Sequence, residues 1–134
     1  MKVILVYTRD IPKVYSILEA SFEPLETEFE ALRFPDTLDE VSVKNAERIL
    51  SSLRSSDYAI FAVPEEEIPL GCLWFFSGYA AGRAREDYLY IYNPGKMKLP
   101  WWLAEAPSGK TAEEMKAYFA VTIPRRRIEK VGEA

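Results

Sequence analysis

Short apolar stretches without polar alternation place the strongest constraint on how this chain can fold. Residues 3–7 read VILVY, residues 58–63 read YAIFAV and residues 88–92 read YLYIY. A strand with one face in water alternates apolar and polar residues, whereas an unalternated strand is covered on both faces. Such strands are typical of a parallel sheet between two helical layers, and they predict that architecture here.

The segments between these strands carry helical or edge-strand patterns. Apolar residues at helical spacing follow Pro12, which suits a first helical turn, and stop at Pro24. Residues 25–34 alternate glutamate with less polar residues, which predicts a half-exposed edge strand. We expect a second helix over residues 42–55, from its apolar stripe, and a third over residues 72–85.

The last third of the chain is less regular. Asn-Pro-Gly at residues 93–95 is a strong turn signal, residues 96–107 are expected to be irregular, and Ser-Gly at residues 108–109 is expected to form another turn. Thr111 followed by Glu114 has the spacing of a capping box, so a last helix is expected to start there.

The end of that last helix is left open by the sequence. Residues 120–123 either continue it or form a fifth short strand. Pro124 is expected to end either element, because proline has no amide hydrogen. The three arginines at residues 125–127 are then expected to lie in a solvated tail.

The alternation of strands and helices predicts a three-layer α/β fold over residues 1–134, as a single domain. The sheet should be flavodoxin- or Rossmann-like and parallel, with four or five strands in the order 2-1-3-4 and helices on both faces. Ligands of such sheets bind at the carboxyl ends of the strands, where the strand order reverses. Tyr7, Thr8 and Arg9 should line that crevice from one side and residues 64–71 from the other.

Composition excludes several classes of chemistry. The chain has no histidine, which removes Ser-His-Asp and Cys-His catalysis and the commonest metal ligand. Its single cysteine, Cys72, has no partner for an internal disulfide and is expected to be structural. A net charge of −4 argues against nucleic acid as a partner, and no apolar run is long enough for a membrane helix. We expect a cytoplasmic protein without metal, cofactor or membrane partner.

Three features could carry a function. Glu65, Glu66 and Glu67 follow the third strand, where carboxylates can act as nucleophile or general base; a solvated acidic turn is the alternative. The helix start near Gly71 could bind an anion through free N–H groups, or be an ordinary connection. Trp101-Trp102 in an irregular segment suggests a lid or a dimer contact. We attribute the WxxxE spacing of Trp101 and Glu105, seen in some proteins that act in signalling or NAD cleavage, to chance.

One ordered set of residues resembles a known family. A helix with Leu50 and Leu53 leads to Asp57 and an apolar strand, and these are followed by Leu70-Gly71, by Gly78-Tyr79-Ala80 and by the strand at residues 88–92. In this order residues 46–95 resemble the nucleoside 2-deoxyribosyltransferase family, within it the deoxynucleoside-monophosphate N-glycosidases. Tyr7 and Arg9 also fit. The resemblance implies the three-layer fold and a nucleoside or nucleotide ligand.

The resemblance also implies a mechanism, and the residues that it requires are absent. The family carries a Glu-Leu-Gly-x-Ala motif on a helix. A glutamate two residues before the glycine of this motif attacks the anomeric carbon and forms a glycosyl–enzyme intermediate. That position is Phe76 when counted from Gly78 and Phe75 when counted from Gly71, while the assisting aspartate falls on Ile49. None of these side chains is a carboxylate.

Three functions therefore stay open. The first is a nucleotide- or nucleoside-binding protein without transferase chemistry. The second is an N-glycosidase or deoxyribosyltransferase whose nucleophile is relocated to Glu65, Glu66 or Glu67. The third is an interaction module without a small-molecule ligand. Family members are commonly oligomers, so a homodimer is expected. The expected ligand-binding residues are Tyr7, Thr8, Arg9, Gly71, Ser77 and Gly78.

Overall fold

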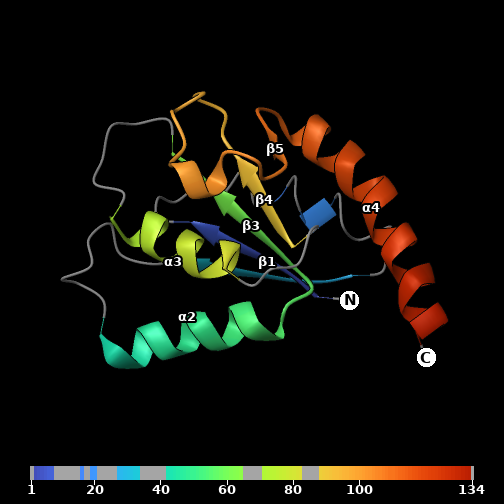
Figure 1. The fold of residues 1–134 in the computed structure, drawn as a ribbon, viewed down its shortest axis with the longest axis horizontal. Coiled ribbons are helices and arrows are strands. Elements are labelled where there is room, and N and C mark those ends of the chain that lie inside the picture. Colours follow the sequence, from blue (N-terminus) through green and yellow to red (C-terminus); the bar gives the residue numbers. More distant parts are fainter. Residues whose placement is uncertain are drawn as a thin grey trace.

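A parallel sheet forms the middle layer of the protein (Figure 1). The computed structural model describes residues 2–7, 16, 19–20, 27–33, 42–64, 71–82 and 88–133. The five strands of the sheet lie in the order β2-β1-β3-β4-β5. They are β1 (Lys2–Tyr7), β2 (Glu28–Arg33), β3 (Tyr58–Ala62), β4 (Leu89–Tyr92) and β5 (Ser108–Gly109). This confirms the predicted α/β class, the parallel pairing and the reversal of order between β1 and β3.

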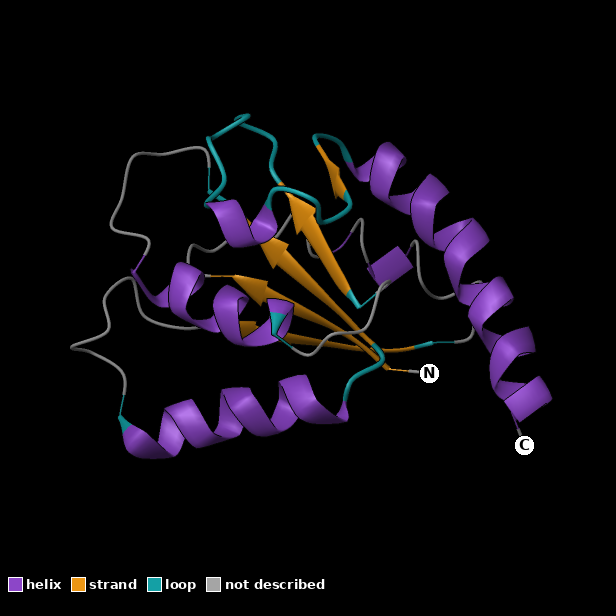
Figure 2. Ribbon diagram, viewed as in Figure 1, coloured by secondary structure: helices purple, strands orange, loops and turns teal. Residues whose placement is uncertain are grey.

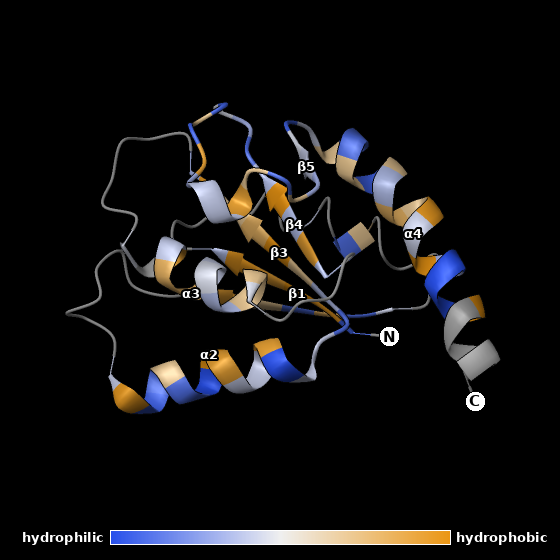
Figure 3. Cartoon of the chain, in the orientation of Figure 1, coloured by the Kyte–Doolittle hydropathy of each residue, from blue (hydrophilic) through white to orange (hydrophobic). Residues whose placement is uncertain are grey.

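Helices cover both faces of the sheet (Figures 1 and 2). One face carries α2 (Val43–Ser55), α3 (Gly71–Ala81) and the short 3-10 helix η3 (Trp101–Leu103), and the other carries α4 (Ala112–Glu133). We call them the α3 face and the α4 face. Successive residues of a strand point to opposite faces, so Ile4 packs on the α3 face and Leu5 on the α4 face. Both are buried, which explains why these strands show no polar alternation (Figure 3).

Asp57 makes two hydrogen bonds to the backbone of Lys2 at the amino end of the sheet. Its Oδ2 accepts a hydrogen bond from the Lys2 backbone N–H at 2.9 Å, and its own N–H donates to the Lys2 carbonyl at 2.8 Å. Lys2 also pairs with Glu30 of the edge strand β2, with Nζ and Oε2 2.8 Å apart. This aspartate belongs to the pattern that resembles the transferases, and here it joins β1 to the start of β3.

The predicted helices are largely confirmed. Ser42 caps α2, because its Oγ accepts a hydrogen bond from the Asn45 N–H at 3.1 Å. The described part of α3 ends at Ala81, and residues 83–85 of the predicted helix lie outside the described residues. Of the first predicted helix, residues 16, 19 and 20 are described and are helical.

Two predictions for the last third of the chain are wrong. Ser108-Gly109 is a strand, not a turn, and it pairs with Ile91 and Tyr92. The helix does not end at Pro124: α4 continues to Glu133, so the three arginines are helical and do not form a tail. Pro124 is exposed and removes one hydrogen bond, a loss that the packing of the neighbouring residues offsets. Ile123 is fully buried, and the Arg126 guanidinium lies 6.0 Å from the centre of the Tyr58 ring.

Candidate functional site

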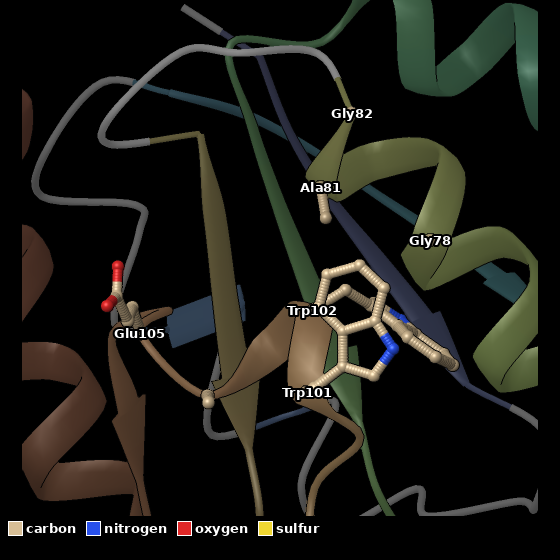
Figure 4. A pocket seen from close by; sticks show the side chains of 7 residues that line it. Gly78, Ala81, Gly82, Trp101, Trp102 and Glu105 are labelled. Carbon is tan, nitrogen blue, oxygen red and sulfur yellow. The ribbon is translucent and has the colours of Figure 1, made fainter.

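A groove lies on the α3 face, between the second half of α3 and the segment around η3 (Figure 4). Its volume is about 570 Å³, within the range of small-molecule sites. The described residues that line it are Gly78, Ala81, Gly82, Trp101, Trp102, Ala104 and Glu105. Glycine and alanine form one wall and two indole rings form much of the other, so a flat ring can reach the aromatic surfaces.

The turn that carries the two tryptophans is fixed at both ends. Pro100 precedes η3 with φ −63°, and Leu103, which closes the 3-10 helix, is fully buried in the core of the α3 face. The Leu103 N–H donates to the Pro100 carbonyl at 3.0 Å. Because Leu103 points into the core, Trp101 and Trp102 emerge toward the helix layer and solvent.

Trp102 is the fixed wall of the groove. It is half-buried, and its Nε1–H donates to Ser77 Oγ at 3.3 Å. Ser77 is fully buried in α3 and donates its own hydroxyl hydrogen to the Trp74 carbonyl at 2.9 Å. This chain of hydrogen bonds holds the Trp102 ring against α3.

Trp101 is the accessible wall. Its side chain is 83% exposed, and its ring meets that of Trp102 edge to face, with centroids 5.7 Å apart and planes at 87°. Aromatic pairs favour this edge-to-face geometry. One indole face of Trp101 is therefore open to a ligand.

Glu105 is the charged residue of the groove's described lining. Among the described residues that line the groove it is the ionisable one, and it is exposed. Figure 4 shows the two indole rings together below Ala81, with Glu105 set apart from them. The groove thus has an aromatic part and, away from it, a carboxylate that can accept hydrogen bonds.

The loop before η3 is held by Asn93, at the carboxyl end of β4. Its Nδ2 donates to the Met97 carbonyl at 2.8 Å, and its Oδ1 accepts from the Met97 N–H at 3.0 Å. The Lys96 N–H donates to the Asn93 carbonyl at 3.2 Å, which confirms the predicted turn. The Asn93 amide therefore positions the loop.

The structure brings together only part of the predicted ligand-binding set. Gly78 lines the groove and Ser77 supports Trp102, whereas Gly71 is exposed at the start of α3. Tyr7 packs against the core of the α4 face, on the opposite side of the sheet from Trp102. Thr8, Arg9, Glu65, Glu66 and Glu67 lie outside the described residues.

The three positions at which the resemblance expects catalytic carboxylates hold apolar side chains. Phe76 and Ile49 are buried in the core of the α3 face, at 0% and 4% exposure. Phe75 is 55% exposed and touches Phe76 edge to face, with ring centroids 5.1 Å apart. Neither phenylalanine nor isoleucine can attack an anomeric carbon or move a proton.

The sequence interpretation missed Ala81, Gly82, Ala104 and Glu105 as site residues. It took the spacing of Trp101 and Glu105 as chance, yet both line the same groove, on the 3-10 turn and just beyond it. The usable signal was the tryptophan pair directly after Pro100, since a bulky apolar pair in an irregular segment suggests a binding surface.

Fold and groove together define a class: an α/β protein with a Rossmann-like parallel sheet and an aromatic groove in one helical layer. Comparison of the chain with models of protein families, with curated proteins and with solved structures gave no match. No helix within the described ranges is both long and apolar enough to cross a membrane. The groove is therefore the feature of the structure that supports a functional proposal.

Proposed function

We propose that the protein binds a nucleoside, with the base stacked on the open face of Trp101 and the sugar directed toward Glu105. The observation that carries this proposal is a groove of about 570 Å³ that joins a tryptophan pair to a carboxylate. A nucleoside has the same two parts, because a flat aromatic base is attached to a sugar that bears hydroxyl donors.

Stacking is the larger contribution. Base–aromatic stacking is worth about 1–3 kcal/mol per base. Trp102 is held by Ser77 and sets the orientation of Trp101, so little order has to be gained when a base binds. The facing wall at Gly78 and Gly82 lacks side chains and leaves room for the ring.

Charge favours a nucleoside over a nucleotide. The described lining contributes the Glu105 carboxylate and no cation. A carboxylate accepts hydrogen bonds from sugar hydroxyls, as acidic residues do in dinucleotide-binding folds, but it repels a phosphate placed beside it. The resemblance to the deoxyribosyltransferases points to the same ligand class.

Binding without transferase chemistry is the form of the proposal that Phe75, Phe76 and Ile49 support, since none of them can replace a carboxylate. Incubation with deoxynucleosides and their monophosphates, followed by chromatography, should yield no free base. Released base would contradict this part of the proposal, and loss of that activity in Glu65→Gln, Glu66→Gln or Glu67→Gln would identify the nucleophile.

The binding experiment is a calorimetric titration with adenosine, guanosine, cytidine, uridine, their 2′-deoxy forms and their 5′-monophosphates. We expect at least one nucleoside to bind more tightly than its monophosphate. Trp101→Ala should weaken that binding about tenfold or more, equivalent to about 1.4 kcal/mol of lost stacking. Glu105→Gln should reduce the preference for the nucleoside over the monophosphate.

Phe75→Ala is the matched control, because it also removes an exposed aromatic ring from the α3 face but does not alter the described lining of the groove. It should bind as the unaltered protein does. No binding across the panel at millimolar concentration, or equal losses in Trp101→Ala and Phe75→Ala, would overturn the proposal.

A further inference from the structure

α4 carries a second apolar stripe, on the side directed away from the sheet. Its inner side buries Met115, Phe119 and Ile123, each at most 1% exposed. Its outer side presents Val121 at 67% exposure and Ile128 at 73%. A helix that covers one face of a sheet needs one apolar stripe, with polar residues opposite. The second stripe has no role in the fold of the described residues.

The outer stripe continues on both sides of Val121. It comprises Ala117, Val121, Pro124 and Ile128, all exposed, at successive spacings of four, three and four residues. These spacings keep the residues on one side of an α-helix, and they match the seam through which two helices pack together. The stripe is therefore suited to another helix.

The stripe is symmetric along its length, which points to a second copy of this chain. Two α4 helices packed antiparallel, with the two-fold axis between Thr122 and Ile123, place Ala117 opposite Ile128 and Val121 opposite Pro124. A two-fold interface requires one patch to be complementary to itself. Here the smallest residue of the stripe meets the largest, and two residues of intermediate size meet each other.

Charge selects the antiparallel arrangement. The first turn of α4 carries Glu113 and Glu114, and Arg125, Arg126 and Arg127 follow Pro124. The half of α4 before Ile123 has a net negative charge and the remainder a net positive charge. An antiparallel pair sets each acidic half beside a basic half, whereas a parallel pair would align the arginines of both chains.

We propose that the protein forms a two-fold symmetric homodimer through the outer stripe of α4, with the two helices antiparallel. This differs from the dimer contact expected at Trp101 and Trp102. The interface lies on the α4 face and the aromatic groove on the α3 face, so the groove stays accessible in the dimer. Dimerisation and ligand binding can therefore be tested separately.

The test is sedimentation velocity over a concentration series. The unaltered protein should sediment as a dimer that dissociates on dilution. Val121→Glu and Ile128→Glu place a charge in the apolar seam and should raise the dissociation constant about tenfold or more. The control is Val43→Glu, because Val43 on α2 is 76% exposed and lies away from the stripe. It should leave the dimer intact, and circular dichroism should show all three variants folded.

A mixing experiment tests the antiparallel arrangement. The variant Glu113→Arg/Glu114→Arg has two basic halves of α4, and Arg125→Glu/Arg127→Glu has two acidic halves. Each alone should be monomeric, whereas an equimolar mixture should recover a dimer. A monomeric unaltered protein at every concentration, or a dimer that persists in both Val121→Glu and Ile128→Glu, would overturn the proposal. Failure of the mixture to associate would overturn the antiparallel pairing.

Discussion

On the α4 face, Tyr58, Tyr90 and Phe119 pack ring against ring, whereas on the α3 face Gly78, Ala81 and Gly82 leave a groove beside Trp102. The difference follows from how the chain covers each face. α4 is a helix of 22 residues, whereas the connection from β4 to β5 contains only the short η3. A 3-10 helix of 3 residues leaves part of α3 uncovered, and that part becomes a candidate site.

The largest effects should come from truncating the aromatic core of each face. Phe76→Ala on the α3 face and Phe119→Ala on the α4 face each remove a side chain that is at most 1% exposed. Both should lower the free energy of unfolding by about 3–5 kcal/mol. Urea denaturation measures the loss. A much smaller loss for Phe76→Ala would mean that the α3 face is loosely packed beyond its groove.

Replacing a glycine by alanine tests the same difference between the tightly packed α4 face and the groove on the α3 face, with a smaller expected change in stability. A Cβ on Gly109 would overlap the Tyr90 hydroxyl oxygen and approach the Glu114 side chain, so Gly109→Ala should destabilise the fold by about 1–3 kcal/mol. A Cβ on Gly78 would meet Trp102 Nε1 at an ordinary 3.8 Å. Gly78→Ala should therefore preserve or slightly raise the melting temperature while it narrows the groove. Equal destabilisation by both variants would contradict the difference in packing between the α4 face and the groove.

Alkaline pH should destabilise the fold through Tyr90 on the α4 face. Burial, with the nearby Glu114 charge, raises the pKa of Tyr90 to about 12. The folded protein therefore keeps this proton where the unfolded chain loses it, and the stability that results is present below about pH 10 and is lost as the pH rises through about 12. The expected loss is up to about 3 kcal/mol. Chemical denaturation across this pH range should show that the free energy of unfolding falls less steeply with pH in Tyr90→Phe than in the unaltered protein. An identical slope for the two proteins would refute this role of Tyr90.

The smallest effect should come from the hydrogen bond behind the groove. Ser77→Ala removes the acceptor of the Trp102 Nε1–H and should lower stability by about 1 kcal/mol, because the half-buried indole can bond to water instead. Nucleoside binding should weaken as well, since Trp102 is no longer held. Unchanged binding in this variant would mean that the orientation of Trp102 is set by packing alone.

The sequence was most informative where local pattern and tertiary packing agree. Val3 to Val6 and Tyr58 to Val63 are buried on both faces, so their composition alone predicts a covered parallel sheet. Ser42 predicts the start of α2 because a capping hydrogen bond is local. In both cases the responsible residues are close together in the chain.

The sequence was misleading where contacts between residues far apart in the chain determine the local structure. β5 has two residues, too few for a pattern, and forms because Ser108 and Gly109 meet β4. α4 continues past Pro124 because Ile123 and Arg126 pack against the sheet. The groove arises where α3 meets η3, and Ser77 and Trp102 are 25 residues apart in the chain. Its lining could not be read from spacing along the chain.

The hydrogen bond from Trp102 to Ser77 also has a spectroscopic consequence. The chain has 3 tryptophans, so a ¹⁵N-correlated spectrum should contain three indole N–H resonances in a region free of backbone amides. The Trp102 resonance reports an N–H bonded to a buried serine, while that of Trp101 belongs to a ring that is 83% exposed. The two walls of the groove can thus be followed separately in one titration, without any label on the ligand.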